Sequence, residues 1–243
     1  MKFGIVRFPG SNCDSDCFHV VESLLKENSF YLWHEENDLR GADCVILPGG
    51  FAHGDYLRTG AMAKISPIMD SIKSFAAAGG PVLGICNGFQ VLTESGLLPG
   101  ALLGNRDGKF VCDWINLRVE NAGTPFTSGY KKDAVIRMPI AHGEGRYYLD
   151  GKDLAALEKN GQIVFRYCAG NGECTDAGNP NGSLASIAGV SNERGNVIGL
   201  MPHPERCCEA SLGGEDGLVL FRSIRNYLRG ASQGARGRES VKT

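Results

Sequence analysis

Residues 82–90 read Val82-Leu83-Gly84-Ile85-Cys86-Asn87-Gly88-Phe89-Gln90, and they join a short apolar run to a helical pattern. The cysteine at this junction stands between two glycines. Larger side chains at the glycine positions would clash in a tight strand-to-helix turn, so the arrangement predicts a nucleophile elbow that presents Cys86. The N-terminal end of the following helix would favour the thiolate. The N–H group of Asn87 would be free to face a developing oxyanion.

Outside this segment, short apolar runs alternate with longer helical patterns. The alternation is the signature of a parallel sheet with crossover helices. It predicts an α/β fold with an open, mainly parallel, twisted sheet that is flanked by helices. The expected strands are residues 3–8, 30–33, 44–47, 82–85 and 197–201, and the expected helices are residues 16–27, 60–78, 88–95 and 217–228.

The middle of the chain has a different character. Short β-rich runs joined by turns predict a small antiparallel excursion from the main sheet. A Gly/Asn-rich stretch over residues 169–183 is expected to form a long loop. The runs in question are residues 110–112, 115–119, 134–139 and 163–167.

The length of 243 residues suits a single α/β unit, and no linker divides the chain. We therefore expect one domain over residues 1–230. The short Gly/Ser-rich stretch over residues 231–243 is expected to be a flexible C-terminal tail.

Composition and charge exclude several classes of protein. Apolar residues make up 42% of the chain, which is too many for a disordered protein. The formal net charge is -2 and the pI is about 6.2, so no broad basic field exists to attract nucleic acid or anionic lipid. No apolar run reaches the length of a membrane span.

The cysteines indicate the compartment. Their number, nine, is odd, and a domain of this size needs no disulfides, which predicts reduced thiols in the cytoplasm. Their spacing lacks the paired two-residue pattern of zinc sites, so we expect no metal site.

A histidine follows the last expected strand, in the sequence Met201-Pro202-His203-Pro204-Glu205. The prolines restrict the backbone and would hold the imidazole at the carboxyl end of the sheet, where open α/β sheets place their sites. Glu205 lies two residues beyond His203, so both side chains of an extended segment can face the same way. The carboxylate could then orient the imidazole, which predicts a triad of Cys86, His203 and Glu205.

A third candidate element lies at the end of another expected strand, in Leu47-Pro48-Gly49-Gly50-Phe51. Consecutive glycines let backbone N–H groups approach a ligand closely. Gly50 and Phe51 could therefore supply the second half of an oxyanion hole, opposite Asn87.

Taken in chain order, these elements resemble the class I, or triad, glutamine amidotransferases. The resemblance is more specific to the glutaminase subunits of phosphoribosylformylglycinamidine synthase, and its motifs cover the chain to about residue 228. The strings that carry it are Phe8-Pro9-Gly10-Ser11-Asn12-Cys13-Asp14, Gly49-Gly50-Phe51-Ala52-His53-Gly54-Asp55-Tyr56-Leu57-Arg58, Gly84-Ile85-Cys86-Asn87-Gly88-Phe89-Gln90, Pro139-Ile140-Ala141-His142-Gly143-Glu144-Gly145-Arg146-Tyr147, Asn179-Pro180-Asn181-Gly182-Ser183 and Met201-Pro202-His203-Pro204-Glu205-Arg206.

The resemblance implies that Cys86 attacks the carboxamide of L-glutamine while His203 moves the proton. It also implies that Gln90 helps to hold the amino-acid end of glutamine and that His142 and Glu144 line the substrate pocket. Ammonia would pass to a large ATP- and Mg-dependent synthetase subunit, which converts formylglycinamide ribonucleotide to the amidine. A small bridging subunit would join the complex, and this chain would carry no cofactor of its own.

Two other readings of the residues remain open. A related cysteine hydrolase or peptidase could use the same elbow, although such relatives take their histidine from soon after the cysteine, and none follows Cys86 before His142. A non-catalytic thiol regulator would oxidise Cys86 instead of acylating it. Such a regulator has no need of His203 and Glu205.

Overall fold

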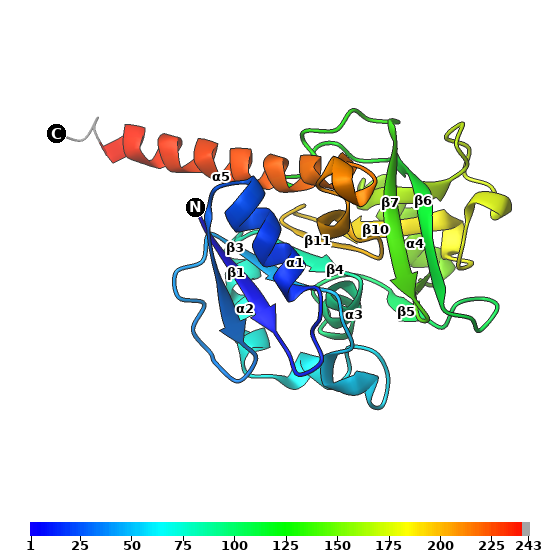
Figure 1. Cartoon of the computed structure of the whole chain (residues 1–243), viewed down its shortest axis with the longest axis horizontal. Helices are drawn as coiled ribbons and strands as arrows, with labels where there is room; N and C mark the ends of the chain where they lie inside the picture. Colours follow the sequence, from blue (N-terminus) through cyan, green and yellow to red (C-terminus); the bar gives the residue numbers. More distant parts are fainter. Residues whose placement is uncertain (240–243) are drawn as a thin grey trace.

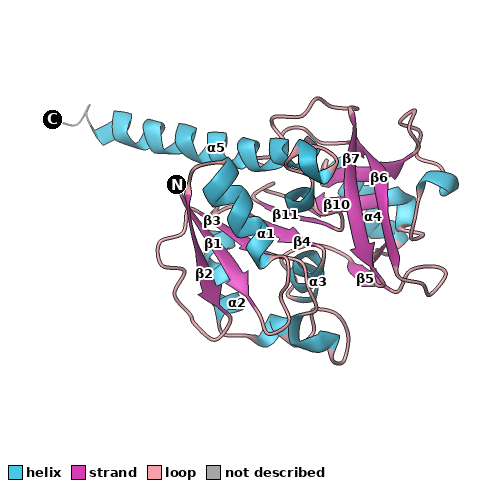
Figure 2. Ribbon diagram, viewed as in Figure 1, coloured by secondary structure: helices cyan, strands magenta, loops and turns pink. Residues whose placement is uncertain are grey.

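The computed structural model describes residues 1–239, and their strands form a nine-stranded sheet in the order β2-β1-β3-β4-β11-β10-β9-β6-β7 (Figures 1 and 2). Five neighbouring strands form a parallel half. All five were predicted, and this half confirms the expected α/β class. They are β1 (Lys2–Arg7), β2 (Asn28–Trp33), β3 (Cys44–Leu47), β4 (Val82–Ile85) and β11 (Val197–Leu200).

The antiparallel excursion extends the same sheet beyond β11. Two of the predicted runs are one continuous strand in the structure, and three short strands were not predicted. The excursion consists of β6 (Val111–Val119), β7 (Val135–His142), β9 (Ile163–Cys168) and β10 (Ile187–Ser191), with a separate pair, β5 (Ala101–Leu103) and β8 (Arg146–Tyr148).

Helices cover both faces of the parallel half, with α1 and α5 on one face and α2 and α3 on the other (Figure 1). The first helix continues into a π-helical turn, Val20–Leu24. The helices are α1 (Asp14–His19), α2 (Ile68–Ala77), α3 (Asn87–Glu94), α4 (Gly151–Lys159) and α5 (Asp216–Glu239).

The single helix expected over residues 60–78 is wrong. The segment forms a 3-10 turn, Ala63–Ile65, and then α2. Ser66 between them is extended, with ψ 141°. The residue before a proline is driven out of the helical region, and Pro67 has this effect on Ser66.

The last helix differs from its predicted length. α5 runs to Glu239, whereas the pattern predicted its end at Leu228, and it extends beyond the sheet (Figure 1). Part of the expected tail is therefore helical. Residues 240–243 of that tail lie outside the described residues.

Three strand ends meet in the middle of the sheet. Strands β3, β4 and β11 are buried along their whole length, as expected for parallel strands covered on both faces. Ile85 pairs with Leu200, and Leu47 pairs with Gly84. The segments that follow these strands therefore emerge side by side at one edge. No helix among the described residues has both the length and the apolar character to span a membrane.

Candidate active site

Cys86 sits at a strained elbow between β4 and α3. Its backbone lies at φ 49° and ψ -105°, a conformation that a non-glycine residue rarely adopts. A Cβ on Gly84 would lie 2.5 Å from the Leu92 side chain, and one on Gly88 would lie 2.0 Å from the Leu47 carbonyl oxygen. The glycines are thus required by close packing, and the elbow expected from the sequence is present.

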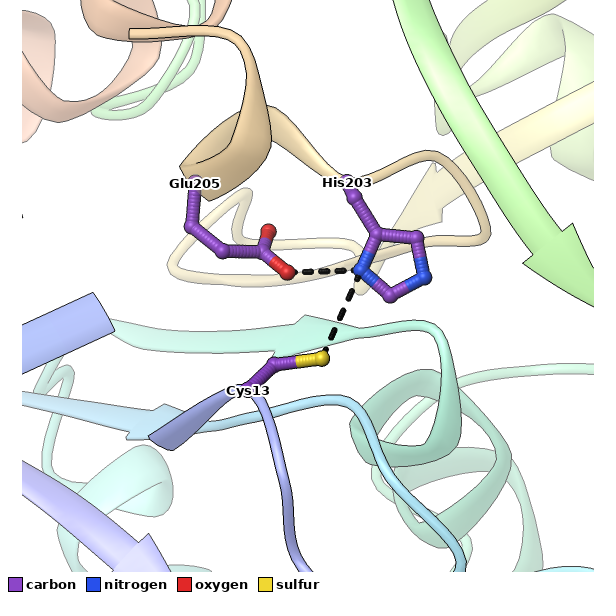
Figure 3. A group of neighbouring side chains, drawn as sticks. All are labelled: Cys13, His203 and Glu205. Atoms are coloured by element: carbon purple, nitrogen blue, oxygen red, sulfur yellow. Dashed lines mark hydrogen bonds and ion pairs between the residues drawn. The ribbon is translucent and has the colours of Figure 1, made fainter. Parts of the chain in front are cut away.

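His203 and Glu205 form a buried pair at the end of β11 (Figure 3). The His203 Nδ1 atom lies 2.6 Å from Glu205 Oε1, and the two side chains are 3% and 0% exposed. The backbone N–H of His203 donates to the Pro139 carbonyl at 2.9 Å, which fixes the loop. An ionised carboxylate only accepts hydrogen bonds, so Nδ1 carries the proton and donates it to Glu205. The other ring nitrogen, Nε2, has no partner among the described residues and is free to accept a proton.

The electrostatics of His203 favour its charged form. Burial would lower the pKa of the imidazole, but the Glu205 carboxylate and the sulfurs of Cys86 and Cys13 raise that pKa well above its usual range. A protonated His203 can give its proton to a leaving group, which is the role that a triad requires.

Cys13 is a neighbour of His203 that was quoted in the family-like strings but given no role. Its Sγ lies 3.8 Å from His203 Nδ1 (Figure 3). The same Sγ accepts a hydrogen bond from Arg206 Nη2 at 3.2 Å. Burial raises the pKa of the Cys13 thiol. The donor atoms of Cys13, His203 and Glu205 lie within 4.8 Å of one another, so these side chains could together contact a metal ion.

Two adjoining cavities meet at Cys86. The first has a volume of about 140 Å³, and the second, beside His203, about 180 Å³. Both are lined by Gly50, Phe51, Cys86, Phe110 and Ala141. The first cavity is also lined by Asp55, Thr59, Gln90, His142, Gly143 and Glu144. The second cavity is also lined by Asn12, Cys13, His203 and Arg206. A substrate carbon bonded to Cys86 would therefore lie between the two.

The predicted oxyanion donors divide into two groups. The N–H groups of Gly50 and Asn87 make no hydrogen bond within the described part of the chain. Phe51 was also expected to donate, but its N–H donates to the Gly10 carbonyl at 2.9 Å instead. The expectation for the Phe51 N–H is therefore corrected, although its side chain lines both cavities.

Gln90 and His142, which the resemblance implied as substrate-pocket residues, both line the first cavity. The Gln90 amide accepts from Asn87 Nδ2 at 2.9 Å and donates to the Glu144 carbonyl oxygen at 2.5 Å. Burial and the charge of His203 lower the pKa of His142 to about 4, so it is neutral at pH 7. Thr59 and Phe110, which also line this cavity, carry no chemical signal in the sequence and were not predicted.

Comparison with known proteins agrees with this geometry. The family model described as a CobB/CobQ-like glutamine amidotransferase domain matches residues 1–227. A protein of Moorella thermoacetica named phosphoribosylformylglycinamidine synthase subunit PurQ is 56% identical over 236 residues, which cover 97% of this chain and 100% of the relative. A protein of Synechocystis with the same name is 58% identical over 222 residues, covering 91% and 99%.

A solved structure is also similar. A chain in the structure of PurLQS from Thermotoga maritima aligns with a TM-score of 0.83 at 46% identity, over 93% of this chain and 98% of that chain. The shared fold and sequence extend over almost the whole length of each protein. This chain therefore belongs to the family of phosphoribosylformylglycinamidine synthase PurQ subunits, the glutamine amidotransferase subunits of a ligase of purine biosynthesis.

Proposed function

We propose that the chain hydrolyses L-glutamine through a glutamyl thioester on Cys86 and delivers the ammonia to a synthetase subunit. The observation that carries the proposal is the buried His203–Glu205 pair: Nε2 of His203 has no partner among the described residues, and His203 lines the same cavity as Cys86. A strained nucleophile, an oriented base and two free N–H groups together make up the machinery of acyl transfer.

The first half of the cycle forms the thioester. The Cys86 thiol gives its proton to His203 Nε2, and its sulfur attacks the carboxamide carbon. The oxyanion that develops accepts hydrogen bonds from the N–H groups of Gly50 and Asn87. His203 Nε2 gives its proton to the leaving nitrogen, the C–N bond breaks, and ammonia departs. Glu205 holds the imidazole in the required tautomer throughout.

The second half hydrolyses the thioester. His203 Nε2 takes a proton from water, and the hydroxide attacks the same carbon from the side that ammonia left. The C–S bond breaks, the proton returns to the sulfur, and glutamate is released. Glutamine and water are thus converted to glutamate and ammonia, with Cys86 and His203 restored.

The ammonia is used in a partner. In this proposal a large subunit uses ATP and Mg²⁺ to convert formylglycinamide ribonucleotide to the amidine, and a small bridging subunit completes the assembly in the cytoplasm. Exposed apolar side chains that line the cavities or lie in sequence between lining residues support docking there, since a partner must cover the exit if ammonia is not to escape. These side chains are Phe51, Tyr56, Leu57 and Phe110, which are 50%, 75%, 86% and 56% exposed.

The test is Cys86→Ala in the reconstituted complex. We expect glutamine-dependent synthesis to fall by at least about 10⁴-fold, because the nucleophile is lost. Synthesis from added ammonia should stay near the wild-type rate, because it bypasses this subunit. Loss of both activities would contradict the proposal and make Cys86 a structural residue.

A further inference from the structure

The first cavity beside Cys86 contains two carboxylates without a cation. Glu144 Oε2 accepts only the Thr59 hydroxyl at 3.1 Å, and Asp55 accepts only Asn87 Nδ2 at 3.3 Å. Among the described side chains, neither carboxylate takes part in an ion pair. The nearby guanidinium of Arg58 pairs with Glu94 instead, at 2.6 Å.

The two carboxylates interact with each other. Asp55 has its pKa raised to about 6, first by burial and then by the negative charge of Glu144. Two anions held together in a partly buried cavity destabilise one another unless a positive charge is placed between them. The cavity therefore has a strong electrostatic preference for a cation.

The imidazole of His142, in the same cavity, also lacks a hydrogen-bond donor. Asn105 Nδ2 donates to the carbonyls of Lys109 and His142, so its Oδ1 must be the acceptor for His142 Nδ1 at 3.1 Å. His142 therefore carries its proton on Nδ1. His142 lines the cavity with a side chain that is only 3% exposed, and its Nε2, an acceptor, has no partner among the described residues.

The side-chain amide donors beside this cavity already have acceptors within the protein. Asn87 Nδ2 serves Asp55 and Gln90, and Gln90 Nε2 serves the Glu144 carbonyl oxygen. The polar side chains that face this cavity thus offer acceptors to a ligand. An ammonium group, with three N–H donors and a positive charge, is the complementary ligand.

Resting on the glutaminase activity proposed above, we propose that Asp55 and Glu144 bind the α-ammonium group of L-glutamine, with His142 Nε2 as a further acceptor. The nucleophile Cys86 lines the same cavity, so a glutamine bound there can present its carboxamide to the thiol. Asp55 and Glu144 are then specificity residues for an amino-acid amide, and Gln90 is a positioning residue that holds Asn87 and the Glu144 backbone in place.

The experiment compares L-glutamine with glutaramate, which keeps the carboxamide and the carboxylate but lacks the α-amino group. The enzyme is the reconstituted complex, and the quantity is the ratio of kcat/KM for the two substrates. Wild type should prefer L-glutamine by at least about 10²-fold, because glutaramate brings a negative charge to two carboxylates and offers no cation.

Glu144→Gln and Asp55→Asn should each lower this preference by about tenfold or more. The loss should come from KM for glutamine, while kcat/KM for glutaramate stays equal or rises. Both changes keep side-chain volume, and Asn tolerates the positive φ of Asp55, 55°. Glu94→Gln is the matched control, because Glu94 is paired with Arg58 and does not line the cavity. It should leave the preference unchanged.

Three outcomes would overturn the inference. Variants that keep the wild-type preference for L-glutamine would refute the ammonium site alone. Variants in which kcat/KM falls to the same degree for both substrates would also refute it. Synthesis from added ammonia shows in each case that the variant folds and assembles. A wild-type complex that hydrolyses neither substrate would refute the proposed function and the ammonium site together.

Discussion

His203 has two neighbours that hold it with different strength. Glu205 Oε1 lies 2.6 Å from Nδ1, which is a short charge-assisted contact, whereas Cys13 Sγ lies at 3.8 Å. The carboxylate therefore sets the orientation and the charge of the imidazole, and the Cys13 thiol fills the space beside it. Neither neighbour contacts Nε2, so both leave the catalytic nitrogen open.

Replacing Glu205 with Gln should slow glutamine hydrolysis by about 10²–10⁴-fold. The amide keeps the size of the side chain but removes the negative charge that raises the pKa of His203. Steady-state kinetics of the complex over a range of pH would measure the loss and the fall in that pKa. An unchanged rate would remove Glu205 from the triad.

Replacing Asp55 with Asn should stabilise the folded protein at neutral pH. Its pKa is about 6 in the folded protein, against about 4 in an unfolded chain. Between these values the folded state binds more protons, so its contribution to stability falls as the pH rises from 4 to 6. At pH 7.5 Asp55→Asn should therefore raise the free energy of unfolding by about 1 kcal/mol, after allowance for its half-exposed position.

The measurement is urea denaturation of wild type and Asp55→Asn at pH 7.5 and pH 4.5. The difference in the free energy of unfolding should shrink at the lower pH, because wild-type Asp55 is then protonated in the folded state. An equal difference at both pH values would show that the carboxylate charge is not its cause.

At the scale of elements, close packing between α3 and the strands beneath it fixes the elbow. The carbonyl oxygen of Leu47, at the end of β3, approaches Gly88 so closely that no side chain fits there. This contact joins the oxyanion segment after β3 to the nucleophile after β4. The elbow is thus a property of two strands and a helix together.

Gly88→Ala should destabilise the protein by about 2–4 kcal/mol, because its Cβ would lie 2.0 Å from a backbone oxygen that cannot move freely. Gly151→Ala at the start of α4 is the control, since nothing lies within 4 Å of its Cβ. It should be neutral or slightly stabilising. Urea denaturation measures both, and equal stability of the two variants would contradict the packing argument.

Local sequence patterns predicted the elements that form the parallel half, because buried strands and amphipathic helices have distinct periods. These patterns predicted fewer of the elements whose secondary structure depends on tertiary contacts. β10 is a five-residue run directly after a 3-10 turn, Leu184–Ser186, and the apolar residues of α4 form one consecutive run, so neither has a strong period of its own. Pro67 was a signal for the break before α2, but the apolar spacing on both sides of it suggested one continuous helix.

The whole molecule brings the site together from distant segments. Cys86, His203 and Glu205 could be proposed because each follows a strand in a recognisable motif. The proximity of Cys13 to His203 and the position of Asp55 in the cavity depend on how separate loops meet, so no local pattern revealed them. The engaged N–H of Phe51 likewise depends on Gly10, forty-one residues away in sequence.

The central claim is that Cys86 is the thiol that glutamine acylates, and affinity labelling tests it most directly. The complex is treated with a diazoketone analogue of glutamine, with and without excess glutamine, and digested for mass spectrometry. We predict one adduct, on Cys86, which glutamine suppresses, with Cys13 and the other seven cysteines unmodified. A complex in which Cys86 stays unlabelled, or in which glutamine gives no protection, would contradict the account.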